Sequence, residues 1–296
     1  MNNFDDMLNV PVYQDEKTAA FVAQSKENRT RCYEMADQTA MEIAGNGGSF
    51  QTYLDVQSRF DRYSVNNALL IMAQNPEATK LGDYGHWREQ GVYVQRAEKQ
   101  NPILILEPGK EYTREDGSTG QYYNAKKIYD IAQTTTKDKN QPSVTHDEKL
   151  VIRALIHNAP IALRTLEPED MPAEVGALLD TANNCIDIRK GMSAEDIFRS
   201  VSVELAHAEF AENNPDYDRN ENSLKAYCAS YMLCKKNSID TGGYSFDRVA
   251  DAFEGMEAQE IKGELSDIRD AAGAISSRMA KVLEQGSNTR QPSHER

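Results

Sequence analysis

The chain has 296 residues, of which 39% are hydrophobic and 27% are charged, and these fractions are typical of a soluble globular protein. A net charge of −14 excludes a strongly electropositive nucleic-acid-binding protein, because nonspecific binding depends mainly on phosphate neutralisation. The charge is uneven, however: residues 56–132 carry ten Lys or Arg against ten Asp or Glu, which permits a local basic groove in the first half.

The sequence also bears on the compartment of the protein. No run of about 18 apolar residues is present, so we expect no membrane span. The first residues lack the positive flank and apolar core of a signal peptide. The four cysteines show no C-x-x-C spacing and are interpreted as reduced thiols. We therefore expect a cytoplasmic protein.

The first half predicts helices followed by strands. A helical pattern covers residues 15–44 and ends at a glycine-rich break at 45–48. A second helix begins at Ser49, and a third covers 64–74 and ends before Pro76, because the residue before a proline resists helix. Strand-like runs follow at 92–95, 103–106 and 122–131, with a turn at 115–118. This order predicts an α+β domain with a small antiparallel sheet.

The second half predicts a mostly helical domain with a short sheet. The polar, turn-rich segment 134–143 is the best linker candidate. Expected helices lie at 146–158, 193–211, 221–236, 246–254 and 258–283, and expected strands at 161–164, 175–179 and 185–188. We place an N-terminal domain at 15–135, a linker at 136–146, a second domain at 147–285 and a frayed tail at 286–296.

The expected helix 193–211 contains an incomplete metal-binding motif. Ser193 and Asp196 give it a start similar to a capping box. Residues 203–207 read Val-Glu-Leu-Ala-His, the pattern of a zinc-peptidase H-E-x-x-H motif with valine in place of the first histidine. Valine cannot ligate a metal. This helix is therefore an active site, a relic of one, or an ordinary core element.

Residues 59–67 form the densest group of unusual side chains in the first half. One interpretation is a helix–turn–helix corner in which Ser64 caps the second helix and the asparagines bond to backbone. The other is a surface for single-stranded nucleic acid, whose bases stack on aromatic faces while Arg and Lys contact its backbone. Ten of the fourteen tyrosines lie before residue 141. Side chains that could supply both functions are Arg59, Arg62, Tyr53, Tyr63, Tyr84, Trp87, Arg88, Tyr93, Arg96 and Lys99.

Several motifs of the first half resemble the N-terminal domain of the ArdC-type antirestriction family, which includes LtrC-like proteins of conjugative elements. The resemblance covers roughly residues 15–135 and implies a single-stranded-DNA-binding α+β domain on a protein of plasmids and integrative elements. Its motifs are Phe50-x-x-Tyr-Leu, Arg59-Phe-x-Arg-Tyr-Ser-Val-Asn-Asn-Ala-Leu-Leu-Ile, Gln74-Asn-Pro-x-Ala-Thr, Trp87, Gly91 and Ile103-Leu-Ile-Leu-x-Pro. The DNA-binding residues that we expect are Arg59, Arg62, Tyr63, Asn66, Asn67, Trp87, Arg96 and Lys99.

Two departures from the family pattern lie in this first half. Asp61 stands where the family often has a histidine, and residues 97–100 read Ala-Glu-Lys-Gln where a Gly-Glu-Lys-Gly turn is common. A carboxylate at position 61 weakens phosphate contact locally.

The second half resembles the zincin-like metallopeptidase domain of the same family, which supplies two histidines and an acidic residue to a catalytic zinc. In this chain Glu204 and His207 match, Val203 replaces the first histidine, and Lys225 falls on the acidic segment. With two of three ligands missing, we expect no metal, no cofactor and no catalytic residue, and Glu204 and His207 are remnants. The alternative is a residual zinc peptidase in which His207 binds metal with relocated ligands drawn from Glu209, Glu212, Glu221, Cys228 and His157.

The sequence thus predicts a single-stranded-DNA-binding, antirestriction-like accessory protein of a conjugative or other mobile element, with an inactive metallopeptidase-like domain. Single-stranded DNA is the expected partner, a host restriction or defence protein is a further candidate, and no membrane partner is expected. A second alternative is an acidic interaction or decoy module, because residues 141–296 carry 17 basic against 27 acidic side chains.

Overall fold

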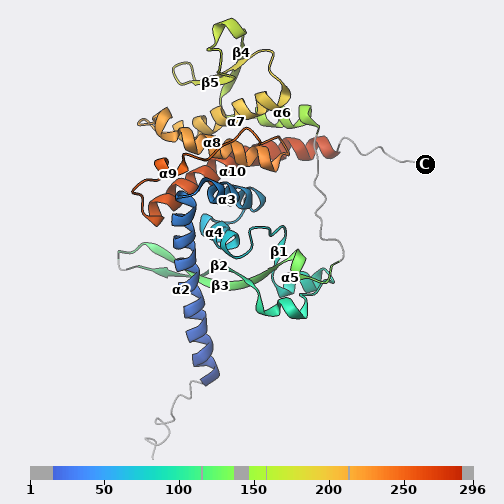
Figure 1. Cartoon of the computed structure of the whole chain (residues 1–296), viewed down its shortest axis with the longest axis vertical. Coiled ribbons are helices and arrows are strands. Elements are labelled where there is room, and N and C mark those ends of the chain that lie inside the picture. The colour runs from blue at the N-terminus through green and yellow to red at the C-terminus, as the bar shows by residue number, and fades with distance from the viewer. Residues whose placement is uncertain (1–15, 115, 137–146, 158, 213, 289–296) are drawn as a thin grey trace, which may run out of the picture.

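The computed structural model describes residues 16–114, 116–136, 147–157, 159–212 and 214–288. All but one residue of the expected linker 136–146 lie outside these ranges, and so does most of the expected tail. The chain is mixed α+β, as expected, with one small antiparallel sheet and one small mixed sheet. Figure 1 shows the helices of the second half stacked on those of the first half, with one sheet at each end.

Three helices open the chain close to their expected bounds: α2 (Glu16–Ala44), α3 (Gly47–Arg59) and α4 (Val65–Gln74). The side chain of Asn46 caps α3 by accepting the Ser49 N–H at 2.8 Å. Ser64 caps α4 in the same way, through the Asn67 N–H. Local capping therefore defines the corner between α3 and α4.

The first sheet is a long hairpin with a short third strand. Strands β2 (Ile103–Thr113) and β3 (Thr119–Asp130) pair antiparallel, with a bulge in β2 between Pro108 and Glu111, and β1 (Leu81–Gly82) pairs with β3. Helix α5 (Tyr84–Glu89) and the 3₁₀ turns η1 (Arg96–Gln100) and η2 (Ile131–Gln133) lie at the end of this sheet where β1 pairs, opposite the hairpin turn.

The expected strand at 92–95 is wrong. This segment joins α5 to η1 and contributes one isolated bridge, between Val94 and Thr134. Its polar groups make individual hydrogen bonds and no continuous strand ladder. The Gln95 N–H donates to the Gln133 carbonyl, and the Gln95 side-chain amide donates to the Thr134 carbonyl at 2.7 Å. A strand-like run of four residues therefore predicted a strand where the backbone forms a loop.

The second half places a mixed sheet over a layer of helices. Strand β6 (Cys185–Arg189) is central, parallel to β4 (Ala162–Leu166) and antiparallel to β5 (Ala177–Asp180). The helices are α6 (Glu148–Ile156), α7 (Ala194–Ala211), α8 (Arg219–Lys236), α9 (Val249–Ala252) and α10 (Ala258–Asn288), and η3 (Pro168–Asp170) is a 3₁₀ turn. Helix α9 is shorter than expected and α10 continues into the expected tail.

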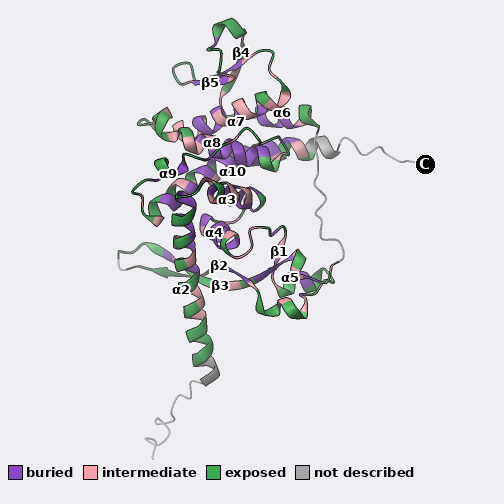
Figure 2. Ribbon diagram, in the orientation of Figure 1, coloured by how far each residue is buried: buried purple, intermediate pink, exposed green. Residues whose placement is uncertain are grey.

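The two halves share one buried core. Helix α8 packs on α3, and α10 packs on α2 and α4, so that apolar residues of both halves form a single cluster. Figure 2 shows this buried layer at α8 and α10, and an exposed surface on the first turns of α2. Polar contacts cross the same boundary, including the Tyr231 hydroxyl, which donates to Asp55 at 2.7 Å, and the ion pair of Lys262 with Asp37.

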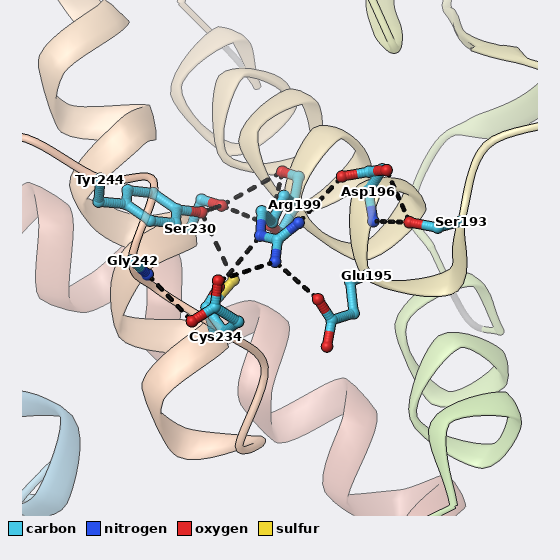
Figure 3. A network of polar contacts seen from close by, with 10 residues as sticks. Ser193, Glu195, Asp196, Arg199, Ser230, Cys234, Gly242 and Tyr244 are labelled. Atoms are coloured by element: carbon cyan, nitrogen blue, oxygen red, sulfur yellow. Dashed lines mark hydrogen bonds and ion pairs between the residues drawn. The ribbon is translucent and has the colours of Figure 1, made fainter.

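A polar network fixes α7 against α8 (Figure 3). The Arg199 guanidinium donates to Glu195 at 2.8 Å, to Asp196 at 2.9 Å and to the Asp240 carbonyl at 3.0 Å. Beside it, the fully buried hydroxyls of Ser202 and Ser230 lie 2.6 Å apart. The network begins at the predicted cap of α7, where the Asp196 N–H donates to Ser193 at 3.2 Å.

Within the described ranges, no helix combines the length and the apolar character that a membrane crossing requires.

Candidate functional site

A groove with a volume of about 500 Å³ lies between the α3–α4 corner, α5 and the hairpin. Arg62 and Tyr63, two of the expected DNA-binding residues, line it from the corner. His86, Tyr123 and Lys126 line it as well, and sequence reasoning missed all three. They come from α5 and β3, so only the hairpin's position beside the corner brings them to Arg62 and Tyr63.

The groove combines aromatic walls with balanced charge. The Lys126 ammonium lies 3.0 Å from Asp83 and 2.7 Å from Glu107, and hydrogen bonds to these two carboxylates raise the pKa of Lys126. The His86 N–H, by hydrogen bonding to Asp83, is the main cause of the lowered pKa of that carboxyl. Arg62 has no ion-pair partner among the described residues, so it is the free cation of this groove.

Asn67 also lines the groove, from α4, and its amide is bonded to the backbone of β2. Its side chain donates to the Leu106 carbonyl at 2.9 Å and accepts the Leu106 N–H at 2.8 Å. About two turns further along α4, Gln74 makes the same two bonds with the backbone of Leu104, both at 2.9 Å. These two amides of α4 satisfy the outer edge of β2, which otherwise presents unpaired backbone groups.

Trp87 is not available for base stacking. Its side chain is 1% exposed, and the indole N–H donates to the Tyr129 carbonyl at 3.1 Å. A side chain at Gly82 would collide with the His86 and Trp87 rings. Trp87 therefore anchors α5 to β3, and the single tryptophan signalled packing instead of a ligand surface.

The remaining expected DNA-binding residues lie outside the groove lining. Arg59 is exposed and donates to the Pro76 carbonyl. Asn66 is half-buried, and its Oδ1 is buried without a hydrogen-bond partner among the described residues. Arg96 and Lys99 are exposed on η1, and the Lys99 ammonium lies 5.9 Å from the Tyr84 ring centre.

The Val-Glu-Leu-Ala-His motif at residues 203–207 of α7 contacts an arginine that the sequence did not single out. Glu204, 3% exposed, accepts from Arg219 through both oxygens, at 2.6 and 2.8 Å, and from the Leu179 N–H at 2.7 Å. A bidentate guanidinium–carboxylate pair of this kind is strong and geometrically specific. Glu204 thus ties α7 to the first turn of α8 and to the edge strand β5.

His207 lies beside this pair as a neutral imidazole. It is 2% exposed, and its Nδ1 lies 2.8 Å from the Tyr217 hydroxyl, with which it forms a hydrogen bond. Burial lowers the pKa of His207 to about 4, and the nearby Arg219 acts in the same direction. Tyr217, just before α8, and Arg219, the first residue of α8, therefore supply partners to His207 and Glu204.

The two other positions of the expected ligand set do not offer metal ligands. Val203 is apolar, and it lines a separate surface hollow with Tyr227 and Tyr244. Lys225 lies 3.1 Å from Asp267 and 3.4 Å from Glu264, both on α10, and therefore contacts that helix.

Among the described residues, one group of side chains lies close enough together to share a cation: Asp180, Cys185 and Asp187, with ligand atoms within 4.8 Å. None of the relocated-ligand candidates belongs to it. Arg164 already binds Asp187 at 2.6 and 2.9 Å, and burial raises the pKa of the Cys185 thiol. The Arg164 guanidinium therefore offsets one of the two negative charges of this group and occupies both oxygens of Asp187.

No protein-family model and no curated protein matches the chain. Two solved structures of the antirestriction ArdC protein from plasmid R388 are similar to it. The Mn(II)-bound structure has a TM-score of 0.55 and 15% identity, covering 83% of this chain and 98% of that one. The metal-free structure has a TM-score of 0.48 and 16% identity, covering 74% and 86%. The first of these confirms an ArdC-like fold.

Proposed function

We propose, with this ArdC-like fold as the premise, that the chain is a single-stranded-DNA-binding accessory protein of antirestriction type from a conjugative or other mobile element. The observation that carries the proposal is the groove, in which exposed Arg62 meets Tyr63, His86 and Tyr123. Aromatic faces with a cation beside them suit unstacked bases on an anionic backbone. Binding depends mainly on stacking and is only moderately electrostatic, because the first half carries no excess of basic residues.

Fluorescence anisotropy with labelled oligonucleotides tests this proposal. We expect the chain to bind single strands at low salt and duplex of the same sequence more weakly. Arg62→Ala should reduce the slope of log Kobs against log salt by about 0.7, the value for one phosphate contact on a single strand. Tyr63→Leu should weaken binding at all salt concentrations.

Arg153→Ala is the matched control, because Arg153 is exposed on α6 and outside the groove lining, and its replacement removes the same charge. Absence of binding at low salt, or equal binding to duplex, would refute the proposal.

We further propose that the second half is a metallopeptidase-like domain without peptidase activity. The name of the related Mn(II)-bound structure raises the possibility of a metal here, and the residues present do not fit one. Val203 has no donor atom and both Glu204 oxygens are taken by Arg219, so that of the motif only His207 retains a ring nitrogen, Nε2, beside the Nδ1 that is bonded to Tyr217, and one nitrogen does not make a metal site. The guanidinium already provides the positive charge that a divalent cation would bring to Glu204.

Metal analysis of the purified chain discriminates this proposal from a residual peptidase with relocated ligands. We expect substoichiometric Zn and Mn after dialysis against either ion, both in the wild type and in His207→Ala. Stoichiometric metal that disappears in His207→Ala would favour the residual enzyme.

A further inference from the structure

The outer half of the β2–β3 hairpin carries a cluster of exposed aromatic rings. Tyr112 on β2 is 36% exposed and Tyr122 on β3 is 49% exposed, yet their ring centres lie 4.3 Å apart with planes inclined by 38°. The Arg114 guanidinium lies 6.0 Å from the Tyr112 ring centre. In Figure 1 this end of the hairpin projects beyond α2, on the side away from α5.

The strand register fixes this stack. Tyr112 lies opposite Gly120, and a Cβ at Gly120 would fall within 2.8 Å of the Tyr112 ring. The glycine therefore lets the ring lie flat across β3, next to Tyr122 two residues further on. Because side chains alternate along a strand, Glu111 faces away from the stack, whereas Arg114 shares its face.

The polar groups beside the stack have few partners within the described part of the molecule. Neither tyrosine hydroxyl has a hydrogen-bond partner there, and Arg114 has no ion pair, only a bond from its Nη1 to the Ser118 hydroxyl at 3.1 Å. The two hydroxyls and the exposed Arg114 guanidinium are therefore open to a ligand.

The same face of β3 leads to the groove. Tyr122 and Lys126 are four residues apart and have the same parity, so both side chains leave the same side of the strand, about 13 Å from each other. Lys126 lines the groove, and Asn124 lies between them with an exposed side chain. Glu107 of β2 lies opposite Asn124, and its carboxylate is paired with the Lys126 ammonium at 2.7 Å, so a ligand that leaves the groove along β3 reaches Tyr122 past this ion pair.

We propose that Tyr112, Tyr122 and Arg114 form a second base-stacking site, which takes nucleotides of the same single strand that the groove binds. The inference rests on the proposed DNA-binding function and adds to it the path of the strand. Stacked rings with an unpaired guanidinium suit a planar base on an anionic chain, and every base offers a π face. The site therefore extends the length of DNA that the chain contacts, with little sequence preference.

The test is the length dependence of binding. With an oligonucleotide of about 16 nucleotides, Tyr112→Thr with Tyr122→Thr should raise Kd at least about fivefold, the lower limit for the loss of one stacked base. With about 4 nucleotides, which the groove alone accommodates, Kd should be unchanged. Tyr112→Phe with Tyr122→Phe should bind like the wild type, because the rings remain.

Phe21→Thr is the matched control, because Phe21 is an exposed aromatic side chain on α2 that belongs neither to the groove lining nor to the stack. Unchanged binding of the short oligonucleotide also shows that the threonine variant is folded. Photocrosslinking of a long strand containing 5-iodouracil should label the peptide that contains Tyr122.

The outcomes separate the two proposals. If the wild type binds no single strand, the proposed function fails. If the wild type binds and Arg62→Ala weakens it, but the long strand binds the threonine variant normally, the function stands and the second site is refuted. Equal loss for short and long strands would also refute the second site.

Discussion

The most direct test of the remnant site is replacement of Arg219 by alanine. The change leaves Glu204, 3% exposed, with one remaining hydrogen bond, from the Leu179 N–H. Breaking a buried ion pair by removing one partner costs about 3–5 kcal/mol. Because the Arg219 side chain is 39% exposed, water reaches the vacated position, and we expect the free energy of unfolding to fall by about 3 kcal/mol, at the lower end of this range. For a chain of this size the melting temperature should fall by about 6–12 °C.

Thermal unfolding at pH 7, followed by circular dichroism, measures this loss. Arg248→Ala is the control: Arg248 also pairs with a carboxylate, Asp251, but that pair is 90% and 70% exposed and should contribute nothing measurable. The double variant Glu204→Gln with Arg219→Met should recover most of the stability, because no buried charge remains and the glutamine still accepts the Leu179 N–H. The reasoning is refuted if Arg219→Ala melts like the wild type, or if the double variant is less stable than Arg219→Ala alone.

Three further predictions concern stability. Burial holds the pKa of His207 at about 4 in the folded chain against 6.5 in the unfolded chain, so protonation of the unfolded chain should remove up to about 3 kcal/mol of stability as pH falls from 6.5 to 4, with no effect above pH 6.5. His207→Gln should flatten this part of the curve of unfolding free energy against pH. An NMR titration of His207 with a midpoint near 6.5 would contradict the prediction. Asn67→Ala should lower the free energy of unfolding by about 1–3 kcal/mol and speed hydrogen exchange at the Leu106 amide. Unaltered exchange at Leu106 would argue against the hydrogen bond between the Asn67 side chain and this edge of β2. Ser230→Ala should lower the free energy of unfolding by a similar amount, because buried Ser202 loses one hydrogen-bond partner. A denaturant midpoint equal to that of the wild type would show that water replaces the lost bond.

The sequence alone determined the local structure. Helix α4 begins after the expected cap Ser64 and ends before Pro76, because capping and proline restrictions act over two or three residues. The hairpin follows its expected turn, although β2 and β3 are longer than their apolar runs. The sequence also shows that Val203 removes one metal ligand, since side-chain identity requires no coordinates.

Local patterns failed where a side chain can serve either structure or surface. Asn67 and Trp87 stood in a motif that implied DNA binding, and both are buried in hydrogen-bonded positions. Asn67 bonds to Leu106, 39 residues away, and Trp87 bonds to Tyr129, 42 residues away. Residue type and helical spacing do not indicate such partners.

Only the tertiary structure decided which groups meet. It placed Arg219 on Glu204, so that a guanidinium is bonded to both oxygens of this buried carboxylate. It also brought Tyr123 and Lys126 of β3 to Arg62, which makes one groove of segments about 60 residues apart in the sequence. The physical reason is that hydrophobic periodicity and capping are local, whereas ion pairs and grooves depend on the packing of distant elements, which follows from the shared core.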